Sequence, residues 1–252
     1  MRLGALLGPV TGNSPPDFLA EQARTYANEG FDSLWSAQAL GRGFMLPDPF
    51  VALSVAATAA ADVEIGTAVV QAPLYDPMDL AHRILSLQQI CGDRLTMGLG
   101  AGSTEVDFAA FSRRFETRFA DFGTLVGTLR QILRTGGNEQ GDLSPWPSVR
   151  GGPPLFLGSW GRGVERAARE FDGWIASAHY RTAEQVIAAL GRYRQAGGGR
   201  AVVSTIQLPA GTDLGELRNR LARFAEAGFD DAVVLILPGG PAPDAVRRLL
   251  ET

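Results

Sequence analysis

The chain has 252 residues, of which 45% are hydrophobic, 20% charged and 8% aromatic, a composition typical of globular proteins. Its net charge of −4 argues against a broad nucleic-acid-binding surface. All 23 residues counted as Lys or Arg are Arg, because the sequence contains no Lys. This excludes chemistry that needs a lysine, such as a Schiff base or a P-loop phosphate site. Arg is therefore the only strongly cationic side chain available to bind a phosphate.

A single cysteine, Cys91, excludes a disulfide within the chain and a Cys-rich metal site. It fits a reducing, cytoplasmic environment, and we expect a buried, unreactive thiol. The two histidines, His82 and His179, fall in separate predicted elements, so no metal site is expected. The segment 1–8 lacks the features of a signal peptide. The longest apolar stretch, 49–61, is too short to span a bilayer.

Eight short apolar runs, rich in Val, Ile or Leu, alternate with longer amphipathic segments. Such runs are typical of buried parallel strands. Most of them recur at an interval of about 30 residues, the length of one βα unit. The runs begin near Arg2, Asp32, Val63, Arg94, Pro154, Asp172, Arg200 and Asp231.

The intervening segments carry helix start and stop signals. Ser14, Asp48, Asp76 and Thr182 are each predicted to cap a helix; the first three precede proline, and Thr182 has Gln three residues later. Gly30, Gly197 and Gly228 follow helical runs and are predicted to end them. The sequences at 27–32 and 225–230 resemble each other, with Gly-Phe-Asp before a strand in both, as expected of a repeated unit.

Eight βα pairs predict an α/β fold, a (β/α)8 TIM barrel forming a single domain over 1–252 with shortened βα loops. The alternative is an open doubly wound sheet. That fold favours Gly-x-Gly-x-x-Gly after an early strand, whereas the glycines at 98–102 have a different spacing. The Gly- and Pro-rich segment 135–154 is interpreted as a surface excursion rather than a domain boundary.

In such a barrel the active site lies at the carboxyl ends of the strands. Two of these ends are rich in glycine, and glycine lets a flat ligand approach the backbone. Gly100 and Gly102 end the fourth strand, and the fifth is followed by Gly158, Ser159, Trp160, Gly161 and Arg162. Backbone N–H groups, a hydroxyl and an Arg at the start of a helix favour an anion.

The order and spacing of several segments resemble the luciferase-like family of flavin- and deazaflavin-dependent oxidoreductases over nearly the whole chain. The segments that carry this resemblance are 29–35, 48–49, 63–69, 77–81, 92–102, 105–118, 158–168 and 172–174. No single motif among them is decisive.

The resemblance implies a ring bound over the barrel mouth against a cis-peptide bulge at the third strand, here near Ala68 and Val69. It places the cofactor phosphate at the turn 158–162, and it implies a homodimer, for which the Ala-rich segment 51–61 is a plausible contact surface. The turn, the Ala-rich helix that follows and Asp172-Gly173 resemble the coenzyme F420 branch more than the FMN monooxygenase branch.

The expected function is hydride transfer between coenzyme F420 and a small organic substrate. A two-component monooxygenase that uses reduced FMN is the alternative, and a non-catalytic flavin-binding barrel is a third possibility. The third is kept because many deazaflavin members carry Asp-His where this chain has Ala37-Gln38, and because the loops are short.

Among the polar residues at the strand ends, His179 is the candidate acid–base and Glu105 a candidate for orienting cofactor or substrate. Gln38 is a candidate for a hydrogen bond to the ring. Trp160 is a candidate for stacking and Arg162 for binding the phosphate. For each of these, a structural or surface role is the alternative; for His82, inside a helix, a structural role is expected.

Overall fold

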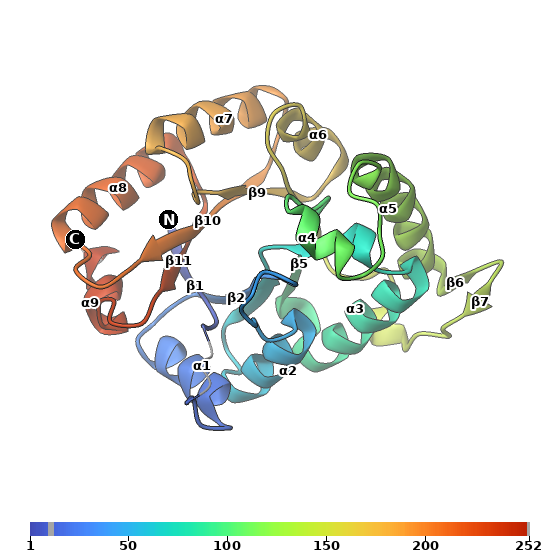
Figure 1. Cartoon of the computed structure of the whole chain (residues 1–252), viewed down its shortest axis with the longest axis horizontal. Helices are drawn as coiled ribbons and strands as arrows, with labels where there is room; N and C mark the ends of the chain where they lie inside the picture. Colours follow the sequence, from blue (N-terminus) through green and yellow to red (C-terminus); the bar gives the residue numbers. More distant parts are fainter. Residues whose placement is uncertain (10–12, 251–252) are drawn as a thin grey trace.

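Eight parallel strand positions close into a barrel surrounded by helices (Figure 1), as the computed structural model shows for residues 1–9 and 13–250. β1 pairs with both β2 and β11, and β3 pairs with β5, which closes the ring. β3 and β4 together occupy one of the eight strand positions. The predicted (β/α)8 barrel is thereby confirmed. Its strands are β1 (Arg2–Leu6), β2 (Ser33–Ser36), β3 (Glu64–Thr67), β4 (Val70–Gln71), β5 (Leu95–Gly100), β8 (Leu155–Gly158), β9 (Gly173–Ser177), β10 (Arg200–Leu208) and β11 (Asp231–Ile236).

Helices follow the strands, and most of them cover the outside of the barrel. They are α1 (Phe18–Asn28), α2 (Pro49–Ala59), α3 (Pro77–Cys91), α4 (Glu105–Ala109), α5 (Arg118–Thr135), α6 (Gly163–Glu170), α7 (Ala183–Gln195), α8 (Leu214–Ala227) and α9 (Pro243–Arg247). Within the described residues, none is long and apolar enough to cross a membrane.

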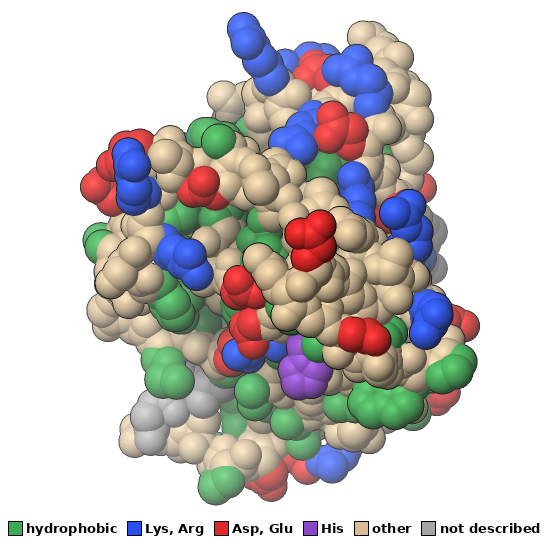
Figure 2. All heavy atoms as spheres, turned by 90° about the vertical axis from the view of Figure 1, so that its right-hand side faces the viewer, with side chains coloured by type: hydrophobic (Ala, Val, Ile, Leu, Met, Phe, Trp, Pro, Cys, Tyr) green, Lys and Arg blue, Asp and Glu red, His purple; other side chains and the backbone are tan. Residues whose placement is uncertain are grey.

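The excursion predicted over 135–154 contains a small hairpin, β6 (Gly137–Asn138) and β7 (Gly141–Asp142), that projects from the barrel beside α5 (Figure 1). Figure 2 shows this side of the molecule, where acidic and basic side chains are intermixed with a few apolar ones. No strand of the barrel is added here, as expected of a surface excursion.

Three of the four predicted helix caps are formed. The Asp48 and Asp76 carboxylates accept hydrogen bonds from backbone N–H groups of the first turn, and Thr182 forms a capping box with Gln185. The prediction for Ser14 was wrong, because α1 begins at Phe18. Two consecutive prolines follow Ser14, and a residue before proline is disfavoured in the helical conformation.

The internal repeat has a structural counterpart. The aspartate before a strand accepts a hydrogen bond from a backbone N–H of the preceding barrel strand, which fixes the register between the two. The same arrangement occurs a third time, at a position where the sequence does not show the repeat. The pairs are Asp32 with Leu3 (2.8 Å), Asp172 with Leu155 (2.8 Å) and Asp230 with Ala201 (2.7 Å).

Apolar side chains fill both the space between barrel and helices and the interior of the barrel itself. The interior cluster consists of Leu6, Trp35, Ala68, Phe156, Ile175, Val202 and Val233. The barrel is therefore a packed core rather than a channel, as is usual for this fold.

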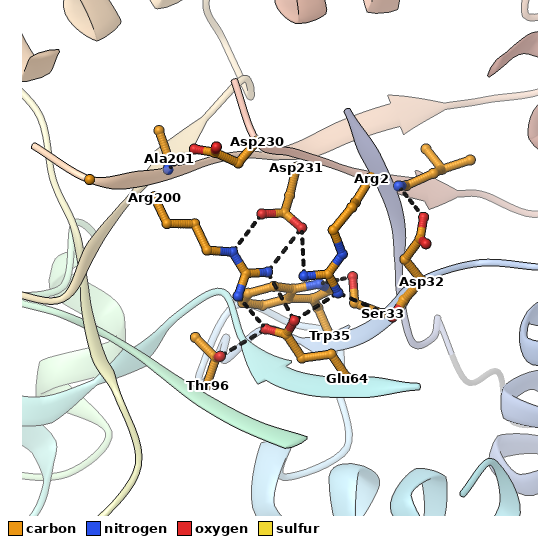
Figure 3. A network of polar contacts seen from close by, with 12 residues as sticks. Arg2, Asp32, Ser33, Trp35, Glu64, Thr96, Arg200, Ala201, Asp230 and Asp231 are labelled. Atoms are coloured by element: carbon orange, nitrogen blue, oxygen red, sulfur yellow. Dashed lines mark hydrogen bonds and ion pairs between the residues drawn. The ribbon is translucent and has the colours of Figure 1, made fainter. Parts of the chain in front are cut away.

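A network of ion pairs occupies the amino-terminal end of the barrel (Figure 3). Arg200 donates to Asp231 at 2.7 and 2.9 Å and to Glu64 at 2.9 and 3.0 Å. Because β10 and β3 lie on opposite sides of the ring, the bonds to Glu64 cross the interior. Arg2 and Thr96 also contact Glu64, at 2.7 and 2.8 Å. The side chains of five strands are thus joined at this end.

Candidate active site

The residues predicted to bind a cofactor gather at the carboxyl ends of three adjacent strand positions. Ala68 and Val69 lie between β3 and β4, Gly100 ends β5, and Gly158 ends β8 and pairs with Gly100. Gly102 follows β5, and the turn after β8 contains Ser159, Trp160, Gly161 and Arg162. Val10 and Thr11, which follow the first strand in the sequence and would on that account be expected at the barrel mouth, lie outside the described residues.

The expected cis peptide is present between Ala68 and Val69. The Val69 side chain packs over the ends of β5 and β8. A Cβ atom added to Gly100 would lie 2.8 Å from Val69 Cγ2, and one added to Gly158 would lie 2.6 Å from Val69 Cγ1. Glycine is therefore needed at both positions to leave room for the Val69 side chain. This reason differs from the expected one, which was the approach of a flat ligand to the backbone.

Two cationic side chains lie at the turn after β8, Arg162 within it and Arg181 from the β9–α7 loop. The Ser159 hydroxyl donates to the Gly163 carbonyl at 2.8 Å, which holds the turn against the start of α6. The Arg181 guanidinium lies 3.9 Å above the Trp160 ring, which makes an edge contact with Trp174. Arg162 is exposed and forms no ion pair or side-chain hydrogen bond with the described residues. Both guanidinium groups thus remain available to an anion.

His179 is half-buried just beyond β9, and its ring packs against the ring of Tyr180 with a centroid separation of 3.5 Å. Tyr180 is 90% exposed. Within residues 1–9 and 13–250 the imidazole has no hydrogen-bond partner. Glu105 begins α4 with an exposed carboxylate that likewise has no partner among these residues. Either side chain is free to contact a bound molecule.

Gln38 follows β2, and both ends of its amide are already engaged. Its Nε2 donates to the Tyr75 hydroxyl at 2.6 Å, and its Oε1 accepts from the Gln71 backbone N–H at 2.8 Å. Burial raises the pKa of Tyr75 to about 12, so this hydroxyl stays protonated at neutral pH. The Gln38 amide therefore connects the β2–α2 loop to β4.

Asp107, in α4, was not singled out in the sequence. Its side chain is fully buried and forms an ion pair with Arg42 of the β2–α2 loop. Its carboxylate also accepts from Gln71 Nε2 at 2.7 Å. Burial alone would raise the pKa of Asp107, but the bonds from Arg42 and Gln71 outweigh burial and lower that pKa below its ordinary value. Asp107 is thus ionised at neutral pH.

A cavity of about 490 Å³ lies beside the carboxyl ends of β1 and β11. Apolar side chains of α1, the end of β11 and the β11–α9 connection form much of its wall, including Phe18, Tyr26, Ile236 and Pro238. Gln22 also lines it and accepts a hydrogen bond from the Gly8 backbone N–H at 2.8 Å. This hollow lies across the ring from the glycine-lined strand ends.

The shape of the whole chain is shared with solved enzymes. It matches monooxygenase RslO1 from Streptomyces bottropensis with a TM-score of 0.81 and 20% identity, covering 99% of this chain and 97% of that one. It also matches the FMN-bound oxygenating component of 3,6-diketocamphane monooxygenase from Pseudomonas putida, with a TM-score of 0.67 and 18% identity over 91% and 80% of the two chains. At these identities the likeness concerns the fold.

A Mycobacterium tuberculosis protein named "putative coenzyme F420-dependent oxidoreductase" is 28% identical over 69% of this chain. The match spans 55% of that relative, about half of its length. The model of the luciferase-like monooxygenase family matches residues 3–225, most of the chain. The chain therefore belongs to the luciferase-like monooxygenase family.

Proposed function

We propose that this protein is an oxidoreductase that binds coenzyme F420 at the barrel mouth and acts on a small organic substrate. When bound, such a cofactor supplies a hydride donor or acceptor, and the protein supplies orientation and electrostatics. The observation that carries the proposal is the Val69 side chain packed over Gly100 and Gly158, together with Arg162 and Arg181 at the turn after β8, neither of which forms an ion pair with the described residues. Val69 would present an apolar surface to a flat ring, and the Arg groups would attract its phosphate.

The resemblance of the 158–168 turn and helix to the deazaflavin branch favours F420 over FMN, as does the name of the mycobacterial relative. The FMN-bound structural neighbour supports the alternative, a monooxygenase that uses reduced FMN. Titrating the purified protein with each cofactor, read by fluorescence, distinguishes them. Tighter binding of F420 is expected. Tighter binding of FMN would favour the alternative, and binding of neither at micromolar concentrations would refute both.

Arg162 is proposed to bind the cofactor phosphate. Replacing it with Met removes a charge-assisted hydrogen bond, a loss of about 1.5–3 kcal/mol, so cofactor affinity should fall roughly tenfold or more. Arg169→Met is the matched control, because Arg169 is also exposed but lies at the opposite end of α6. An equal effect of both substitutions would refute a specific role for Arg162.

His179 is proposed to exchange a proton with the substrate through its unpaired imidazole. His179→Gln should lower kcat, while His82→Gln on the exposed face of α3 should leave kcat unchanged. Glu105 is proposed to orient the substrate from the start of α4, and Gln38 to act by holding Gln71.

Binding without turnover would favour the third possibility, a non-catalytic flavin-binding barrel. Turnover of any substrate with reduced cofactor would refute it.

A further inference from the structure

One buried carboxylate joins three neighbouring strand ends of the barrel mouth. Asp107 accepts from the Leu40 backbone N–H at 3.3 Å and from Arg42 Nε at 2.8 Å, with a second bond from Arg42 Nη2. It also accepts from Gln71 Nε2 at 2.7 Å. These donors belong to the β2–α2 loop and to β4, whereas Asp107 itself follows β5. The carboxylate therefore ties together segments that are distant in sequence.

Through Gln71, Asp107 also holds the segment on which the proposed cofactor surface depends. Gln71 lies two residues after Val69, and its side chain is held by Asp107. On the other side of Val69, the Thr67 hydroxyl donates to the Gly98 carbonyl at 2.8 Å. The segment 68–69 is thus fixed by hydrogen bonds before and after it.

The β2–α2 loop itself has few apolar contacts. Phe44 and Met45 at its tip are 57% and 84% exposed, and a cavity of about 210 Å³ lies within the loop. Gly41 packs closely on α4, where an added Cβ atom would lie 3.0 Å from the Val106 carbonyl oxygen. A loop with so little buried surface depends on its polar contacts for its position, and those to Asp107 include its only ion pair among the described residues.

We propose that Asp107 is a positioning residue of the active site, which fixes both the β2–α2 loop and the segment 68–71 in the arrangement that binds the cofactor. This role rests on the proposed function. It differs from a purely structural role in α4, because it requires that loss of the carboxylate changes ligand binding by the folded protein.

The first measurement is cleavage by chymotrypsin after Phe44 in the native protein, which yields fragments 1–44 and 45–252. Asp107→Asn removes the charge but keeps the shape of the side chain. We expect cleavage at least about tenfold faster, because opening the loop no longer breaks bonds between charged groups. Arg42→Met removes the same ion pair from the exposed loop and should have the same effect. Asp121→Asn, an exposed carboxylate near the start of α5, is the control and should cleave like the wild type.

The second measurement is the affinity of the same variants for F420 and FMN, taken well below their unfolding temperatures. Asp107→Asn and Arg42→Met should bind the cofactor of the wild type about tenfold more weakly. Faster cleavage with unchanged affinity would overturn the positioning role and leave Asp107 a structural residue, and unchanged cleavage would overturn it as well. If the wild type binds neither cofactor, the proposed function fails, whereas the cleavage rate still shows by itself whether Asp107 holds the loop.

Discussion

Replacement of Arg200 by Met tests whether the ion-pair network at the amino-terminal end holds the barrel together. The substitution removes four hydrogen bonds. Glu64 would keep Arg2 at 2.7 Å and Thr96 at 2.8 Å. Among the described residues, Asp231, which is 0% exposed, would keep only Arg2 at 3.5 Å. Removing one partner of a buried ion pair costs about 3–5 kcal/mol, mainly through the charge left behind. Because Arg2 remains near both carboxylates, we expect a loss of about 3 kcal/mol, the lower end of that range.

Urea denaturation measures this loss as a fall in the free energy of unfolding. Arg192→Met is the matched control, because Arg192 lies 3.6 Å from Glu165 with 47% of its side chain exposed. An exposed pair of this kind contributes less than about 1 kcal/mol. If the two variants lose equal stability, or if Arg200→Met loses less than about 1 kcal/mol, the network does not stabilise the barrel as argued.

Three further predictions concern single residues. Burial alone would raise the pKa of Glu64, but bonds from Arg200 and Thr96 and the nearby Arg2 lower it below its ordinary 4.5. The ionised Glu64 therefore contributes its full share to the free energy of unfolding above pH 4.5, and this share is lost as the pH falls through the pKa of the folded state. Glu64→Gln should make the free energy of unfolding, measured by urea titration, fall less steeply at acid pH. Burial raises the pKa of Cys91 to about 11, so a thiol reagent should react with it only after unfolding; reaction in the native state would contradict this. Val51 is 61% exposed on α2. Its substitution by Glu should convert the expected homodimer to a monomer in a sedimentation experiment, and a monomeric wild type would disprove the dimer.

The fold could be predicted because its signals are local. Each barrel strand is a short apolar run. Asp48 and Asp76 are recognisable as helix caps because a proline follows each of them. Ser14 also precedes a proline, but the predicted cap was wrong, because a second proline follows and α1 begins later. The cis peptide between Ala68 and Val69 followed from family resemblance, since nothing in those two residue types demands it.

The polar networks could not be predicted, because their partners meet only in the folded chain. Asp107 lies 65 residues from Arg42 and 36 from Gln71. In the sequence it is an ordinary acidic residue in a short helix. Arg200 and Glu64 are separated by 136 residues, and only closure of the barrel brings them together. Glu105, two residues before Asp107, is a candidate because it follows the glycines at the end of β5, and nothing in the sequence distinguishes its exposed carboxylate from the buried one of Asp107.

The ion-pair network also closes the amino-terminal end of the barrel to ligands. Arg2, Glu64, Arg200 and Asp231 meet at one end of the barrel, above which Trp35 and the other interior side chains are tightly packed. Cofactor and substrate would then have to enter from the opposite end, and product would have to leave the same way. Two ligands that share one opening cannot bind in arbitrary order if the first covers the second. If one ligand covers the other at the barrel mouth, steady-state kinetics should show a compulsory order of binding, with the deeper ligand binding first.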